Sequence, residues 1–148
     1  MRPYSLRLKT ATIEDADLLL YLRNDPEARR ASRNESVITQ CEHTHWLKRR
    51  LGLRNPDIWI AFYISTPVGV VRRDSIKEEL VELSWNVAPD QRGQGFGKEM
   101  VSIIAAVTSG RVGAWLKRWN LSSAKIAEYI GMKKQFVENE MEYWERAD

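Results

Sequence analysis

The sequence predicts a mixed α/β (α+β) fold built around one central sheet. Residues 80–87 alternate apolar and polar side chains, which is the period-two pattern of a half-buried strand. A glycine-rich turn follows, and beyond it apolar residues recur at the spacing of an amphipathic helix. Residues 112–119 form another apolar run, and a strand reached through one crossover helix is expected to be parallel to the strand before it. These observations predict a βαβ crossover in the middle of a sheet of about seven strands.

The N-terminal residues are expected to supply a first strand and a first helix. Residues 5–10 alternate in polarity, as a strand at the edge of a core does. Residues 12–15 resemble a capping box in which Asp15 replaces the usual glutamate, so a helix should begin there and end near residues 25–26. Its apolar face would be formed by Leu18, Leu19 and Leu22.

Two more helices are expected before the central strands. A short basic helix would cover residues 27–32, and its arginines, with Arg33 beyond it, should face solvent. Residues 34–40 show no periodicity and are expected to form a flexible loop. A third helix is predicted over residues 47–51.

The middle of the chain is predicted to form three successive strands. Residues 58–64 are apolar on both faces, which is typical of a buried central strand. After a turn at 66–67 the chain would return over 68–71, and residues 74–79 would form a charged hairpin loop. The strand over 80–87 places on one face Val81, Leu83, Trp85 and Val87, and on the other Glu82, Ser84 and Asn86.

Two helices and a hairpin complete the expected fold. The helix after the glycine turn should end at residues 109–110, and a further helix should cover 121–130, with Gly131 as its C-terminal stop. A last hairpin would pair residues 134–137 with 141–144. The packed face of the first of these helices is predicted to contain Met100, Ile103, Ile104 and Val107.

Composition is typical of a single globular domain, which we assign to residues 1–148. Apolar residues make up 43% of the chain and charged residues 29%. No apolar run reaches the roughly 20 residues of a membrane span, and no apolar segment of a signal peptide follows the first residues. A single cysteine suits a reducing compartment. We therefore expect a cytoplasmic protein that does not contact membranes.

Cys41, His43 and His45 are close enough in sequence to raise the question of a metal site. Residues two apart on a helix do not share a face, and the sequence has no other cysteine or histidine to complete a ligand set. We therefore predict no metal, and a histidine here would more readily cap a helix or contact a substrate.

Gly93, Gly95 and Gly97 lie at the junction of a strand and a helix, which is an arrangement suited to binding phosphate. A dinucleotide fingerprint would need a glycine in place of Lys98 or Met100, so that interpretation fails. A P-loop would need glycine at 92 and a hydroxyl side chain at 99, and it fails as well.

Residues 92–97 do match the pattern Q/R-x-x-G-x-G/A. Residues 120–132 match a second pattern, N-x-x-[AS]-x-x-x-x-E-x-[LI]-G-[FM], on the strand and helix that follow. Together they resemble the two signature segments of the GNAT superfamily of acetyl-CoA-dependent N-acetyltransferases. The resemblance covers essentially the whole chain, the N-terminal third only loosely. It implies a mostly antiparallel sheet with a central parallel pair that splays apart, and helices on both faces.

The resemblance implies that acetyl-CoA binds at the glycine turn. Main-chain amides there should hold the pyrophosphate, Val87 should pair with the pantetheine arm, and Asn120 and Ser123 should lie along the cofactor. Asparagine is also common at helix entries for structural reasons alone. The turn residues assigned in this way are Arg92, Gly93, Gln94, Gly95, Phe96, Gly97 and Lys98.

The resemblance also implies direct attack of an amine on the thioester, which requires a base for the amine proton. Glu82 is the candidate base, and a solvated strand glutamate is the structural alternative. Many members of the family place a tyrosine, as general acid, where this chain has Ala127. Tyr129 lies roughly 200° further around the helix and cannot replace it, so the acid is unassigned and water is left to protonate the thiolate.

Ala127 and Glu128 resemble the branch that contains ribosomal-protein and amino-sugar N-acetyltransferases. Residues 22–26 and 42–46 look more like the amino-sugar enzymes, which act on nucleotide-linked sugars, so Arg23 and His43 would face the acceptor pocket. The N-terminus of a peptide or ribosomal protein is the alternative acceptor, and small polyamines or antibiotics also stay open.

Functions of another class are open at this point. A chain of net charge +3 with six tryptophans could be a nucleic-acid or glycan-binding module, or an acetyl-CoA-binding protein that has lost transfer. Most of the tryptophans fall on apolar faces and no basic stripe separates them, so we expect no nucleic-acid partner. Exposed edge strands near the C-terminus leave room for a homodimer.

Overall fold

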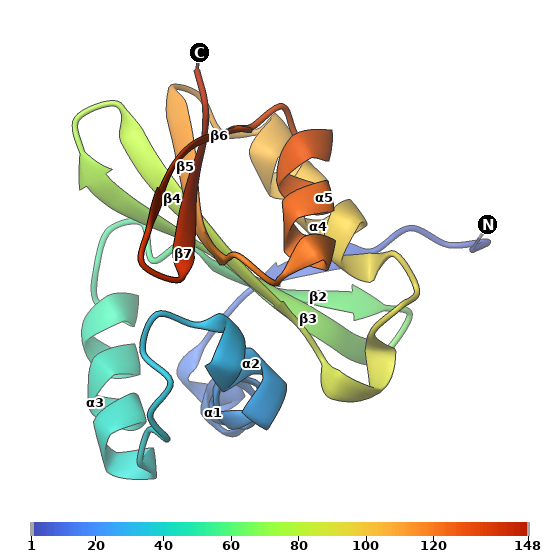
Figure 1. Cartoon of the computed structure of the whole chain (residues 1–148). Coiled ribbons are helices and arrows are strands. Elements are labelled where there is room, and N and C mark those ends of the chain that lie inside the picture. The colour runs from blue at the N-terminus through green and yellow to red at the C-terminus, as the bar shows by residue number, and fades with distance from the viewer. Residues whose placement is uncertain (1, 148) are drawn as a thin grey trace.

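The computed structural model describes residues 2–147. In it, a seven-stranded sheet carries helices on both faces (Figure 1). The sheet order is β1-β2-β3-β4-β5-β7-β6. All neighbours are antiparallel except β4 and β5, which are parallel as the crossover predicts. The elements are β1 (Arg7–Thr10), α1 (Ala16–Asn24), α2 (Pro26–Ala31), α3 (Gln40–Leu51), β2 (Ile58–Tyr63), β3 (Thr66–Lys77), β4 (Leu80–Val87), α4 (Phe96–Ala106), β5 (Arg111–Lys117), α5 (Leu121–Tyr129), β6 (Lys133–Glu138) and β7 (Met141–Arg146).

The two faces of the sheet carry separate apolar cores, and Figure 1 shows α4 and α5 on the face opposite α1, α2 and α3. On the α1–α3 face, Leu19 and Leu47 pack with Ile60. On the other face, Met100 of α4 packs with Ala61, the residue after Ile60 in β2. Successive strand residues point to opposite faces. The apolar run of β2 therefore serves both cores, which confirms that it is a central strand.

Side-chain caps fix where the N-terminal helices begin. Thr12 and Asp15 form the predicted capping box, in which the Thr12 N–H donates to Asp15 Oδ2 at 2.8 Å, and a short 3₁₀ turn then leads into α1. Thr39 caps α3 by accepting a hydrogen bond from the Glu42 N–H at 3.1 Å. Because of this cap α3 begins at Gln40, so the prediction that this helix covers only 47–51 was too short.

The second hairpin is longer than its charge pattern suggested. Residues 74–77 continue β3 instead of forming a loop, and the turn is confined to residues 78–79. Asp74 lies opposite Glu82 in the register and accepts hydrogen bonds from Arg50 and Arg72, so its charge is compensated within the sheet. At the other end of β3, the turn falls at 64–65 and not at 66–67.

Helix α4 buries a face that only partly matches the predicted one, since Met100 and Ile104 are buried as expected. Ile103 and Val107 are 36% and 71% exposed, whereas Val101 and Ala105 are buried beside Met100. The helix contacts both β3 and β4. Its buried stripe therefore faces both strands and is rotated from the predicted stripe toward Val101 and Ala105. The helix was predicted correctly, but it ends at Ala106 and not at residues 109–110, and its buried stripe is rotated by part of a turn.

Candidate active site

Strands β4 and β5 pair over only part of their length. In the chain between residues 2 and 147, their register ends after three residue pairs, and β5 continues along β7 alone. The edge of β4 that faces β5 is therefore open from residue 83 to residue 87. An open strand edge can bind an extended ligand through its main-chain groups. The three pairs are Leu80 with Arg111, Val81 with Val112 and Glu82 with Gly113.

The glycine turn begins after β4 and forms the start of α4. Gly93 and Gly95 have φ of +79° and +84°, in the left-handed region that favours glycine. Gly95 is the N-cap of α4 and provides no side-chain cap, so the first helical N–H groups are open to an anion. Gly97 has a packing role, because a Cβ there would lie 3.0 Å from Ile126 and 3.1 Å from Val87. The turn therefore fits a phosphate group.

The N-terminal segment holds this turn through Arg2. Its guanidinium donates to the main-chain oxygen of Gln94 at 2.6 Å and to the carboxylate of Glu99, and it lies over the Phe96 ring, 4.2 Å from the centroid. Glu99 also accepts a hydrogen bond from the Leu6 N–H at 2.9 Å. The start of α4 is thus fixed to the strand at the far edge of the sheet.

The side chain of Arg92 is directed away from the turn and toward the junction of α1 and α2. Its guanidinium donates to Asp25 at 2.8 Å and to Glu27 at 2.6 Å. The ammonium of Lys98 lies 3.9 Å from the centroid of the Tyr129 ring. The turn therefore offers a phosphate its main-chain amides. The Arg92 guanidinium is paired with Asp25 and Glu27 instead.

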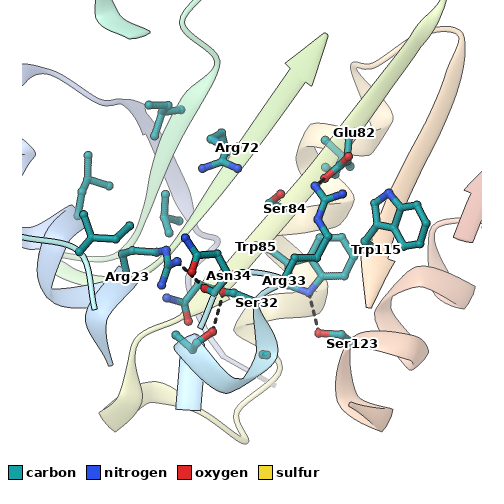
Figure 2. A pocket seen from close by; sticks show the side chains of 18 of the residues that line it. Arg23, Ser32, Arg33, Asn34, Arg72, Glu82, Ser84, Trp85, Trp115 and Ser123 are labelled. Atoms are coloured by element: carbon teal, nitrogen blue, oxygen red, sulfur yellow. Dashed lines mark hydrogen bonds and ion pairs between the residues drawn. The ribbon is translucent and has the colours of Figure 1, made fainter. Parts of the chain in front are cut away.

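A cavity of about 540 Å³ lies between the N-terminal helices and the splayed strands (Figure 2). Five residues predicted for the site from widely separated parts of the sequence line it together. Figure 2 shows Arg23 at one end and Glu82, Trp115 and Ser123 toward the other. The predicted residues that line the cavity are Arg23, His43, Glu82, Asn120 and Ser123.

Glu82 extends from β4 and is 8% exposed. Arg33 Nη2 donates to its Oε2 at 3.0 Å. Burial raises the pKa of Glu82 above its ordinary value, and the positive charge of Arg33 opposes that rise. A carboxylate in such an environment is a stronger base than one in water, which suits it to accept a proton. Arg33 was predicted to face solvent, and its side chain is 56% exposed, but its guanidinium also reaches Glu82 because the loop after α2 turns back over β4.

Arg23 and His43 lie at the α1 end of the cavity. His43 is 5% exposed, and its ring centroid is 5.7 Å from that of Trp46. Burial lowers the pKa of His43, and the charge of Arg23 lowers it further, so the neutral imidazole is favoured. Arg23 Nη2 donates to the main-chain oxygen of Asn34 at 2.7 Å, which orients the guanidinium.

Asn120 and Ser123 are both engaged in contacts within the protein. Asn120 caps α5 by accepting a hydrogen bond from the Ser123 N–H at 3.2 Å. The Ser123 hydroxyl accepts one from Trp85 Nε1 at 3.1 Å, which connects α5 to β4 across the splay (Figure 2). Ala127 is fully buried and Tyr129 is 60% exposed, and among residues 2–147 no tyrosine lines the cavity.

The cavity-lining residues that sequence reasoning missed include Arg33, Arg72 and Trp115. Arg72 lies on the part of β3 that was expected to be past the end of the strand, so its face was not assigned. Trp115 alternates with buried neighbours along β5, and that period could have placed it on the cavity face. Nothing in the sequence around Arg33 indicates its contact with Glu82.

Between residues 2 and 147, no three His, Cys, Asp or Glu side chains gather in a way that could hold a metal ion. None of the helices in that part of the chain is long and apolar enough to cross a membrane.

Solved structures of acetyltransferases have the same fold. A ribosomal-protein-alanine N-acetyltransferase from Brucella melitensis has a TM-score of 0.77 at 19% identity, over 96% of this chain and 99% of that one. AAC(6')-Ib in complex with ribostamycin and coenzyme A has a TM-score of 0.79 at 15% identity, over 97% and 94%. A chimera of the spermidine N-acetyltransferase SpeG from Vibrio cholerae has a TM-score of 0.81 at 12% identity, over 97% and 96%.

A comparison with curated proteins found no match. The comparison with protein families matched residues 5–133 to the acetyltransferase (GNAT) domain. This span includes the splayed strands, the glycine turn and all of α5. With most of its length matched, and with the fold of solved acetyltransferases, the chain belongs to the GNAT acetyltransferase family.

Proposed function

We propose that this protein transfers the acetyl group of acetyl-CoA to a primary amine by direct attack. The observation that carries the proposal is the position of Glu82, which is the last residue of β4 to pair with β5 and which lines the cavity. The open edge of β4 begins directly after it, and the uncapped start of α4 follows along the chain. A buried base and a strand edge suited to an extended ligand thus occur next to each other.

In the proposed step the bond changes occur in the two substrates, and the protein accepts a proton and stabilises the oxyanion. Acetyl-CoA supplies the acetyl group as a thioester. The amine nitrogen bonds to the carbonyl carbon, the carbon–sulfur bond breaks, and the sulfur leaves as a thiolate that takes a proton from water. Glu82 accepts the proton that the amine loses, directly or through one water. Main-chain N–H groups of the open β4 edge stabilise the oxyanion that develops on the carbonyl.

The proposed acceptor is a nucleotide-linked amino sugar. Arg23 and His43 at the α1 end of the cavity support it, because they offer a cation and a neutral imidazole for polar contacts with such a ligand. An N-terminal amine of a peptide or ribosomal protein is the second acceptor, by resemblance to that branch of the family. Ala127, in the place of the common tyrosine, favours one further alternative, a protein that binds acetyl-CoA without transfer.

Calorimetric titration of acetyl-CoA tests the cofactor site with a matched pair of variants. Gly93 faces open space and has positive φ, which Asp and Asn tolerate better than other side chains. Gly93→Asp places a negative charge beside the turn and should weaken binding about tenfold or more. Gly93→Asn has the same size without the charge and should bind nearly as the unmodified protein does. Equal affinity for both variants would contradict a phosphate site at this turn.

Release of free CoA thiol then measures transfer, first with nucleotide-linked amino sugars and then with peptides. Glu82→Gln should bind acetyl-CoA normally and lose about 100-fold or more of turnover. Binding of acetyl-CoA without turnover of any amine would favour the non-catalytic alternative. Failure to bind acetyl-CoA at all would overturn the proposed function.

A further inference from the structure

Two arginines from different elements line the α1 end of the cavity. Arg23 comes from α1 and Arg72 from β3, and Figure 2 shows both at the end remote from Trp115. Arg23 is oriented by its hydrogen bond to the main-chain oxygen of Asn34. Its other terminal nitrogen, Nη1, is buried and has no hydrogen-bond partner among residues 2–147. A buried guanidinium nitrogen without an acceptor is costly, and a ligand oxygen would satisfy it.

Arg72 is also held in a fixed place. Its Nε donates to Asp74 at 3.0 Å, and its guanidinium lies over the Trp46 ring, 5.5 Å from the centroid. Asp74 also receives a hydrogen bond from Arg50, so a single carboxylate serves two cations. The charge of Arg72 is therefore only partly compensated.

The end of the cavity is positively charged overall. Burial lowers the pKa of Arg23, and the charges of Arg72 and Arg29 lower it further, which is the signature of crowded cations. Among the described residues, two carboxylates line the cavity, and neither is hydrogen-bonded to Arg23 or Arg72. Glu82 is paired with Arg33 at 3.0 Å, and the exposed Glu42 accepts a hydrogen bond from the Thr39 hydroxyl. Between residues 2 and 147, no carboxylate forms an ion pair with Arg23.

We propose that Arg23 and Arg72 together bind an anionic group of the acceptor, a phosphate or a carboxylate, while its amine lies at Glu82. The inference rests on the proposed function and deepens it by naming the acceptor class. Guanidinium groups fit such oxyanions because they offer parallel N–H donors in a planar fork. The same charges repel polycations, so this site selects against polyamines and aminoglycosides. The acceptor class therefore differs from the amines in the names of two structurally similar proteins, ribostamycin and spermidine.

The test compares acceptors that differ in one anionic group. Glucosamine is compared with glucosamine 6-phosphate for phosphate, propylamine with β-alanine for carboxylate, and spermidine serves as the polycation. With acetyl-CoA saturating, KM for each amine is taken from thiol release, and affinity is measured independently by calorimetry on the CoA-saturated protein. We expect KM and Kd of the anionic member of at least one pair to be about tenfold lower or more than those of its partner. Which pair shows the difference identifies the group as phosphate or carboxylate.

Arginine variants then assign the effect to this site. Arg23→Gln and Arg72→Gln should each abolish most of the preference for the anionic acceptor, and Arg72→Lys should restore part of it. The KM for acetyl-CoA should stay unchanged in all of them. Arg49→Gln, on the exposed surface of α3, removes the same charge outside the cavity and should keep the preference. Thermal melts establish that each variant is folded.

The possible outcomes separate this inference from the proposed function. Equal or better use of the member without the anionic group in both pairs, or use of spermidine as good as that of every anionic amine, would overturn the inference and leave acetyl transfer intact. A preference that survives both Gln variants would overturn it too, and so would the absence of calorimetric binding of every anionic amine to the CoA-saturated protein. Anion-dependent binding without any turnover would support the inference and contradict the proposed transfer.

Discussion

Arg33 Nη2 lies 3.0 Å from Oε2 of Glu82, so the candidate base is paired with a cation that comes from a loop. The same loop is fixed at two more points, since Asn34 accepts a hydrogen bond from Arg23 and Glu35 forms an ion pair with the buried Lys117 at 2.6 Å. The loop between α2 and α3 therefore forms one wall of the cavity and also influences the charge state of the residue inside it.

Removing the Arg33 partner of Glu82 should shift the pH dependence of transfer. Glu82 accepts a proton only when it is ionised, so kcat/KM should fall as the pH is lowered through its raised pKa. Arg33 stabilises the carboxylate, and Arg33→Gln should raise that pKa and move the acidic limb of the profile to higher pH. The measurement is kcat/KM against pH with a fixed acceptor.

Arg30→Gln provides the control for this experiment. It removes the same charge from the exposed surface of α2, and the acidic limb should stay where it is. An unchanged limb in Arg33→Gln, or a shift to lower pH, would mean that Glu82 is not the group that sets it.

His43 predicts how stability depends on pH. Its pKa is lowered in the folded state, so the unfolded chain binds the proton more readily near the ordinary value of 6.5. The stabilising contribution of the neutral imidazole is therefore present above that pH and is lost as the pH falls through it. Urea denaturation across about pH 5 to pH 8 should show a smaller loss of unfolding free energy on the acidic side for His43→Gln than for the unmodified protein.

His45 is the natural comparison, because it lies on the same helix and is exposed. His45→Gln should keep the slope of the unmodified protein. If both variants change the slope equally, burial of His43 is not the cause.

The sequence was sufficient for the elements whose residues carry a local signal. The alternation of β4, the capping box at Thr12 and the glycine turn each depend on neighbours in the chain, and the structure has all three where they were expected. The charged end of β3 was misassigned because the charge of Asp74 is compensated by Arg50, which is distant in sequence. The contact of Arg33 with Glu82 was missed for the same reason, since a loop arginine has no periodicity that shows its direction.

Adding a side chain at Gly69 should destabilise the packing of α4 on the sheet. A Cβ at this position would lie 2.7 Å from the Asn86 main-chain oxygen and 2.7 Å from the sulfur of Met100. The backbone oxygen cannot move aside easily, so Gly69→Ala should lower the unfolding free energy by about 1–3 kcal/mol. Gly52→Ala is the control, because a Cβ there meets atoms only at 3.4 Å and the backbone is helical, and it should be neutral or raise stability by up to about 1 kcal/mol. Chemical denaturation measures both, and equal stability of the two variants would contradict the close packing at β3.

The hydrogen bond between Trp85 and Ser123 predicts a measurable coupling across the splay. Ser123→Ala leaves the half-buried indole N–H without its acceptor and should cost about 1 kcal/mol of unfolding free energy, whereas the exposed Ser122→Ala should cost much less. A double-mutant cycle with Trp85→Phe should give a coupling energy of about 0.5–1.5 kcal/mol. Additive effects would show that the contact contributes nothing to stability.

The short pairing of β4 with β5 divides the sheet into a group of four strands and a group of three. Between residues 2 and 147, only three strand-paired residue pairs join the two groups, so hydrogen exchange of the native protein should reveal two opening units, with the β5–β7 amides exchanging at a free energy of their own. A ligand in the splay would bind both groups at once, and it would slow exchange at amides that it does not touch. The protection gained in β6 would then report how strongly the ligand couples the two halves of the sheet.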